Sequence, residues 1–120
     1  MFNDIKILQN MSALASHAEK RHALIAENIA NADTPGFKAK DLQPFSEIYK
    51  KAAQNGQKIG ALEAKVQLME AGDIASPNGN TVSLEQQTML AAQTKGEHEM
   101  ALAVYRKTLE MMKMAIGKNI

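Results

Sequence analysis

Residues 3–32 contain no glycine or proline, so this long stretch holds nothing that interrupts a helix. Apolar and small side chains recur in it at alternating spacings of three and four, the period of a helix with one buried stripe. We expect Asn3 to cap this helix and Asp4 to stabilise its first turn. The positions of the stripe are Leu8, Met11, Ala15, Ala18, His22, Ile25, Ile29 and Ala32.

A second stripe with the same period fills the C-terminal part of the chain. Ser83 followed by Gln86 is a capping box, which predicts a helix start, and Gly117 is expected to end that helix. The stripe consists of Leu84, Thr88, Ala91, Lys95, His98, Leu102, Tyr105, Leu109, Met112 and Ile116. Two such stripes at opposite ends of a chain predict an all-α fold, with two long terminal helices paired as an antiparallel coiled-coil hairpin.

Turn-forming residues separate these helices from an irregular middle segment. Pro35 pushes the residue before it out of the helical region and Gly36 accepts a positive φ, so the first helix is expected to stop there. The asparagines and glycine of residues 77–80 predict another turn ahead of the last helix. We therefore expect one structural domain with three parts, the first helix in residues 1–33, the middle segment in residues 34–80 and the last helix in residues 81–120.

The middle segment itself holds weaker signals. Pro44 is expected to open a short helix, which Asn55 and Gly56 then end. Residues 59–70 fit a short strand or a short helix, and their periodicity does not decide between the two. The sequence therefore predicts an irregular segment that holds short helix or strand.

Several large apolar side chains fall outside both stripes. A two-helix unit cannot cover them, so either the middle segment folds over them or other subunits do. Some belong to a methionine cluster near the C-terminus, which is either core filling or an adaptable contact surface. The side chains outside the stripes are Leu14, Leu24, Met89, Leu90, Met100, Val104, Met111 and Met114.

Charge and composition exclude several classes of function. The net charge is +1 with acidic and basic residues interleaved, and neither a basic stripe nor a set of stacking aromatics indicates nucleic acid. The chain has no cysteine, which excludes a disulfide framework and a thiol nucleophile. The uncharged stretch of residues 7–18 is too short and too polar for a membrane span. No basic segment precedes an apolar run, so conventional secretion is not supported.

No arrangement of catalytic or metal-binding residues is recognisable. His17 and His22 are five residues apart, which turns them away from each other on a helix, and His98 lacks a second histidine four residues on. An acid–base pair could be drawn from Glu63, Glu70 and Asp73, but nothing places them in a pocket. The sequence thus predicts neither an enzyme nor a binder of cofactors, metals or small-molecule substrates.

Two short motifs carry a resemblance to a known family. Residues 27–41 resemble the signature that ends the first helix of flagellar rod and hook axial proteins, and residues 76–82 are similar to the segment that precedes their last helix. The motifs occur in the family's order, and the short middle segment is similar to that of its proximal rod members. The matching positions are Asn28, Asn31, Thr34, Pro35, Gly36 and Phe37 in the first motif, and Pro77, Asn78, Gly79 and Asn80 in the second.

The resemblance implies a structural subunit of the flagellar basal-body proximal rod. It implies export from the cytoplasm by the flagellar type III gate and assembly in the periplasm. The implied partners are further copies, rod proteins of the FlgC, FlgF and FlgG types, the adaptor FliE, the membrane ring protein FliF and the export gate, with no nucleic acid. The two stripes, and not the resemblance, supply the residues that we expect to pair the helices and to serve in assembly, which are Leu8, Met11, Ile25, Ile29, Leu102, Tyr105, Leu109, Met112 and Ile116. A cytosolic helical adaptor or export chaperone of a type III secretion system is the alternative.

Overall fold

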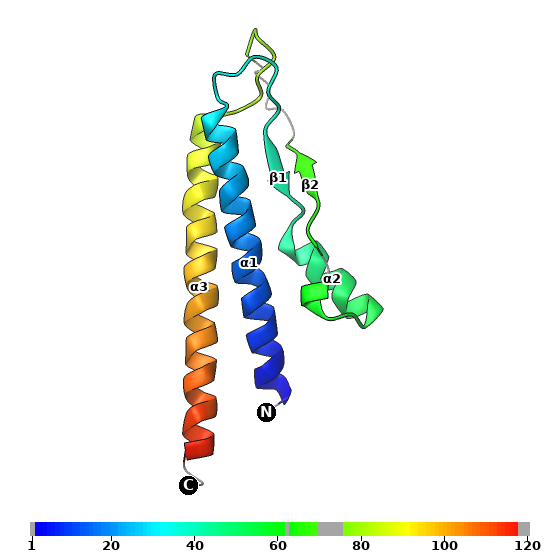
Figure 1. Cartoon of the computed structure of the whole chain (residues 1–120), viewed down its shortest axis with the longest axis vertical. Coiled ribbons are helices and arrows are strands. Elements are labelled where there is room, and N and C mark those ends of the chain that lie inside the picture. The colour runs from blue at the N-terminus through cyan, green and yellow to red at the C-terminus, as the bar shows by residue number, and fades with distance from the viewer. Residues whose placement is uncertain (1, 62, 70–75, 118–120) are drawn as a thin grey trace.

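A computed structural model describes residues 2–61, 63–69 and 76–117 of the chain. Two long helices, α1 (Phe2–Ala30) and α3 (Leu84–Gly117), run antiparallel and in contact, so that the two ends of the chain lie at the same end of the molecule (Figure 1). The molecule is elongated, with extents of 67 × 29 × 18 Å. The predicted all-α hairpin of terminal helices is confirmed.

The ends of the two long helices agree only in part with the expectations. α1 already includes Phe2, so Asn3 lies inside the helix and the prediction that it caps the helix is wrong. α1 stops at Ala30 because its last turn tightens: the Asn31 N–H is shared between the carbonyl oxygens of Glu27 and Asn28. The prediction for α3 is confirmed, since the Gln86 N–H donates to Ser83 Oγ at 3.2 Å and the helix ends at Gly117.

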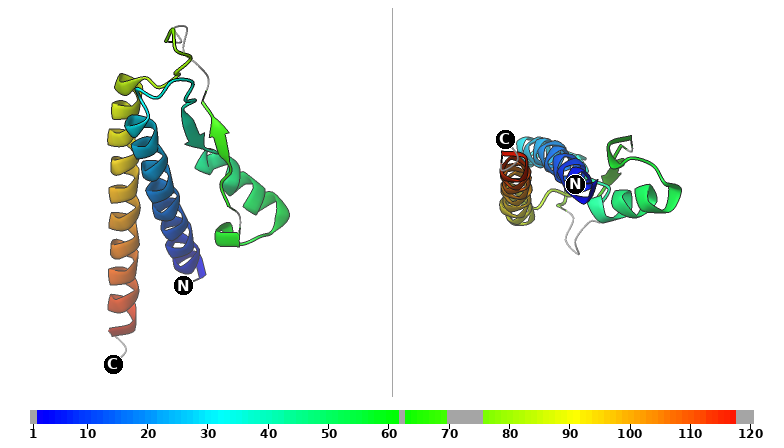
Figure 2. Two further views of the ribbon diagram at one scale, coloured as in Figure 1. Left: turned by 45° about the horizontal axis from the view of Figure 1, so that its top comes forward. Right: turned by 90° about the horizontal axis from the view of Figure 1, so that it is seen from below.

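The middle segment folds back along α1 as an arm. It contains strand β1 (Lys40–Leu42), helix α2 (Phe45–Asn55), the 3₁₀ turn η1 (Ile59–Ala61) and strand β2 (Val66–Leu68). The two strands pair antiparallel, with Asp41 opposite Gln67. In the two views of Figure 2, α1 lies between α3 on one side and the arm on the other.

The helix expected after Pro44 and ended by Gly56 is present, and Gly56 takes a left-handed conformation with φ 63°. The sequence left open whether the next residues form a short strand or a short helix. Residues 59–69 contain both a 3₁₀ turn and a strand. Glu70 and Asp73, two of the three carboxylates considered for acid–base chemistry, lie outside the described residues.

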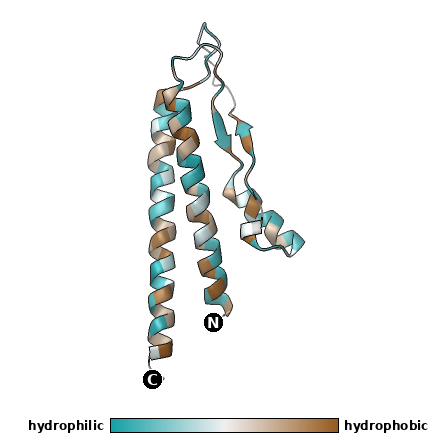
Figure 3. Cartoon of the chain, viewed as in Figure 1, coloured by the Kyte–Doolittle hydropathy of each residue, from teal (hydrophilic) through white to brown (hydrophobic). Residues whose placement is uncertain are grey.

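The buried face of α3 is turned by one residue from the predicted stripe. Its buried positions are Gln87, Thr94, Ala101 and Thr108, which are seven residues apart. The predicted positions Thr88 and Lys95 are exposed instead. The residues in the seam are small or polar, and small side chains allow two helix backbones to approach closely. Apolar and polar residues alternate along both long helices, as the colours of Figure 3 show.

α1 differs from its predicted stripe at two positions and buries a second face. Ala15, Ala18 and Ile25 are buried as expected, but His22 and Ile29 are exposed. The second face packs against the arm, where Ala13 meets a small apolar cluster. That cluster consists of Ile48, Ala52 and Ile59, with Phe45 and Ala64 packed against it.

Candidate assembly interface

Asn28 is the centre of a hydrogen-bonded junction at the end of the hairpin where the three parts of the chain meet. It is 1% exposed. Its amide nitrogen donates to the Lys40 carbonyl oxygen at 2.8 Å and to Gln87 Oε1 at 3.1 Å, and its Oδ1 accepts from the Lys40 N–H at 3.0 Å. One side chain on α1 therefore holds both the start of β1 and the first turn of α3. A buried amide of this kind sets the register of paired helices.

Asn80 ties the turn before α3 to the end of α1. Its amide nitrogen donates to the carbonyl oxygens of Asn31 at 2.9 Å and Thr34 at 2.7 Å, both in the turn that follows α1. Its Oδ1 accepts from the Val82 N–H at 2.8 Å. The second sequence motif thus holds the turn in which the first motif ends the helix.

Two glycines let the two turns approach each other. Gly36 has φ 74° and Gly79 has φ 82°, a region that side chains with a Cβ rarely adopt. A Cβ on Gly79 would lie 3.6 Å from the Gly36 Cα, so the two backbones are in direct contact. The Gly36 N–H donates to the Asn78 carbonyl oxygen at 3.0 Å. The φ > 0 conformations explain why glycine stands at both positions.

The remaining motif residues flank this contact. The Asn31 side chain donates to the Glu27 carbonyl oxygen at 2.9 Å and accepts from Thr34 Oγ1 at 3.1 Å. Both hydrogen bonds are local and stabilise the end of α1. The Phe37 carbonyl oxygen accepts from the Thr81 N–H at 3.0 Å. Pro35 and Pro77 are both exposed.

A row of polar side chains on α1 holds the arm beyond the junction. Arg21 makes two parallel hydrogen bonds to the Asp41 carboxylate at 2.9 and 3.0 Å, with both side chains largely buried. His17 Nε2–H donates to the Gln43 carbonyl oxygen at 2.8 Å, and its ring meets Phe45 edge-on. The arm is therefore fastened mainly by hydrogen bonds, with only a small apolar cluster beneath it.

The predicted pairing residues lie in different environments. Ile25 is buried, whereas Leu8, Met11, Leu102, Tyr105, Leu109 and Met112 are half-buried along the two helices. Ile29 and Ile116 are exposed, so in the single chain they contribute little to the pairing of α1 with α3.

The face of α3 turned away from α1 carries exposed large apolar side chains. A helix position opposite the seam has nothing else of the described chain to pack on, because the arm lies on the far side of α1 (Figure 2). The exposed side chains of this face are Met89, Met100, Val104, Met111 and Met114. The first alternative for these side chains was that the middle segment covers them, and its described residues, 34–61, 63–69 and 76–80, do not.

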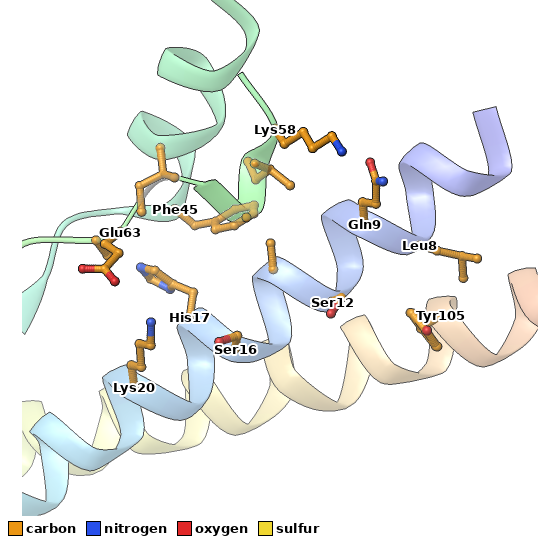
Figure 4. Close-up of a pocket in the computed structure, with 15 residues that line it drawn as sticks. Leu8, Gln9, Ser12, Ser16, His17, Lys20, Phe45, Lys58, Glu63 and Tyr105 are labelled. Carbon is orange, nitrogen blue, oxygen red and sulfur yellow. The ribbon is translucent and has the colours of Figure 1, made fainter. Parts of the chain in front are cut away.

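A cleft of about 640 Å³ separates the N-terminal half of α1 from the arm (Figure 4). Ala13, Phe45 and Ile48 line its apolar part, while Lys20 and Glu63 lie at its rim. Its apolar lining belongs to the cluster that seats the arm, so the cleft is a packing gap beside this cluster. Among the described residues, no group of three or more histidine and carboxylate side chains could hold a metal ion.

The geometry defines a structural class of protein. The molecule is an elongated helical hairpin with a rigid polar junction at one end and an uncovered apolar helix face along its length. Within the described part of the chain, neither long helix has the apolar length that crossing a membrane requires. These features describe a structural subunit that acts through contacts made by its exposed surface.

Comparisons with known proteins show which family the chain is similar to. Residues 8–38 match the family described as flagella basal body rod protein. The flagellar basal body rod protein FlgB of Salmonella typhimurium is 28% identical over 83% of this chain and 86% of its own length. That of Agrobacterium fabrum is 23% identical over 95% of both chains, and that of Proteus mirabilis is 53% identical over 32% of this chain and 27% of its own. The chain is therefore similar to the flagellar basal body rod family in residues 8–38 and to FlgB proteins over most of its length.

These similarities support a structural protein of the flagellar basal-body rod. Members of the matched family are structural proteins of the flagellar basal-body rod, where they assemble with other rod components, and the family is not one of enzymes. The strongest local likeness overlaps the junction, since the matched segment includes Asn28 and extends past Gly36.

Sequence reasoning missed some residues that build the junction. Gln87 is 0% exposed and accepts a hydrogen bond from Asn28, but the predicted stripe contains its neighbour Thr88 instead. The pair of Arg21 and Asp41 was also missed. A basic and an acidic residue in separate elements give no sequence signal that they pair. Thr81 Oγ1 accepts from the Ala39 N–H at 2.9 Å, a contact between segments far apart in the sequence.

Proposed function

We propose that this chain is a subunit of the proximal rod, which polymerises through its terminal helices into a shaft that transmits torque from the basal body. The observation that carries the proposal is the outer face of α3, which exposes Met89, Met100 and Met111 along most of the helix. Apolar surface of this extent is a contact surface in a soluble protein. Likeness to FlgB proteins supports the place of that contact in the rod.

In this proposal the hairpin gives the subunit its stiffness and the junction sets its shape. Residues 1–33 and 81–120 form the rod core, and the arm in residues 34–80 lies beside it. Asn28 and Asn80 hold the two helix ends and the arm in one fixed arrangement. A subunit that carries torque requires such fixed connections, because a loose hinge between its parts would dissipate the load.

The partners are further copies of the chain, rod proteins of the FlgC, FlgF and FlgG types, the adaptor FliE, the ring protein FliF and the export gate. The place is the periplasmic rod, reached through the flagellar type III gate. A thin core suits that route, since most of the described buried apolar residues are alanines, which bury little area each.

Fractionation of hook–basal bodies tests the proposal. In cells that make this chain, it is expected in purified basal bodies that have been stripped of filament, and its deletion is expected to abolish motility. Recovery only from the cytosolic fraction as a soluble dimer would contradict the proposal and favour an adaptor or export chaperone.

A further inference from the structure

The exposed methionines of α3 form a straight row. Met89, Met100 and Met111 follow each other at intervals of eleven residues, and they are 72%, 52% and 66% exposed. Eleven residues make about three helical turns, so successive members drift by only about 20° around the axis. Val104 and Met114 lie on the same side of the helix. The row is therefore continuous along about 33 Å of one helix face.

α1 exposes a second straight row, made of small side chains. Its members alternate at spacings of four and three, which keeps them on one side of the helix. All of them are exposed, and only one is larger than serine. The row consists of Ser12, Ser16, Glu19, Ala23, Ala26 and Ala30.

We propose that the methionine row of α3 in one copy packs onto the small-residue row of α1 in a second copy. The inference rests on the proposed rod function and names the partner surface of the same face. Large side chains that meet small ones across a helix pair interdigitate without voids, and methionine adapts its shape to the gaps. The contact uses different surfaces on the two copies, and a contact of this type extends along a shaft when its rotation does not close a ring.

Helix direction and charge favour the same pairing. Copies related by one helical operation share a polarity, so α3 of one copy runs antiparallel to α1 of the next. In an antiparallel register that places Met100 opposite Ala23, Met111 falls opposite Ser12.

The same register brings opposite charges together. Glu19 falls opposite Val104, one turn from Lys107, and Lys20 falls one turn from Glu99. All four charged side chains are exposed. Glu19 contacts His98 of its own copy at 3.2 Å but is still 70% exposed, which leaves it open to a neighbour.

Disulfide cross-linking tests the pairing, because the chain contains no cysteine of its own. One copy carries Met100→Cys and a second, tagged copy carries Ala23→Cys, and both are expressed together in cells that lack the unmodified chain. After mild oxidation, basal bodies are purified and the cross-linked dimer is quantified. The matched control replaces Ala23→Cys by Ala53→Cys, an exposed alanine on α2.

The expected result is about tenfold more dimer with Ala23→Cys than with Ala53→Cys, because neighbours in a fixed contact have a high effective concentration. Equal yields, or Met100→Cys joined only to another protein, would overturn the pairing while the chain is still found in basal bodies. Absence of the chain from basal bodies would overturn the proposed function and the pairing with it.

A bulky substitution gives a second, independent readout. Ala23→Leu places a large side chain in the small-residue row. It is expected to reduce the amount of chain recovered in basal bodies about tenfold, which corresponds to a binding constant about tenfold weaker. Ala53→Leu is expected to leave recovery unchanged. Circular dichroism of both purified variants should show the same helix content, and normal recovery of Ala23→Leu would overturn the pairing.

Discussion

α1 and α3 are helices of similar length and composition, but the fold covers them very differently. α1 is packed on two sides, by α3 and by the arm, and polar side chains such as Arg21 and Asn28 bond the arm to it. α3 is packed on one side only, and that side is lined by Gln87, Thr94 and Ala101. Met89, Met100, Met111 and Met114 are instead exposed on its outer face.

The difference teaches that large apolar side chains do not mark the buried seam of this hairpin. Small residues line the seam of α3 because they let the helices approach, while the larger residues remain where the single chain leaves them uncovered. Substitutions at the junction and the arm should therefore change the stability of the single chain, and those on the outer face should change its assembly.

Asn28→Leu should have the largest effect on the free energy of unfolding, a loss of about 3 kcal/mol. It removes three hydrogen bonds and leaves buried polar groups of Lys40 and Gln87 without partners. Urea unfolding followed by circular dichroism measures it. Asn31→Leu, at a less buried position with bonds only to its own helix end and Thr34, should cost about 1 kcal/mol. Equal losses for the two variants would contradict the role of Asn28 as the centre of the junction.

Gly36→Val should destabilise the junction by about 1–2 kcal/mol, because valine must adopt φ 74° there. Incorrect placement of the turn should also lower motility. Gly60→Val is the control, since Gly60 has no positive φ and open space around it. Normal motility and unchanged stability of Gly36→Val would show that the turn does not need this backbone conformation.

Arg21→Met should cost about 1 kcal/mol by removing the two-bond pair with Asp41. The loss should be local: amide hydrogen exchange is expected to speed up in β1 and α2 while the α1–α3 seam keeps its protection. Lys107→Met removes a fully surface pair with Glu110 and should change neither measurement. Uniform acceleration along α3 would contradict the separate fastening of the arm.

Met111→Lys should change the free energy of unfolding by less than about 0.5 kcal/mol, since it alters an exposed position. Assembly should nevertheless fail, because a charge replaces an apolar contact on the outer face of α3. Recovery of the variant in basal bodies measures the effect, and Tyr49→Lys on the arm is the control, since it also replaces an exposed large side chain with lysine. Full recovery of Met111→Lys would remove the outer face from the assembly contact.

Local chemistry made much of this architecture predictable. The capping box at Ser83, the stop at Gly117 and the turn at Gly36 depend on neighbours within a few residues, so the sequence shows them directly. The prediction that Asn3 caps the first helix was wrong, because the helix already includes Phe2. Capping residues are preferred at helix starts but do not determine them. The resemblance identified the motif residues of the candidate site, but not the residues with which they form hydrogen bonds.

The sequence by itself determined that two long helices form at the ends of the chain and where the turns between them fall, because periodicity and backbone preference act over a few residues. Only the tertiary structure decided which face of each helix is buried, since one residue of rotation is about 100° and the choice between Thr108 and Leu109 depends on how closely the helices approach. It also decided that Asn28 bonds Gln87 across the hairpin, because a hydrogen bond between distant segments leaves no local pattern.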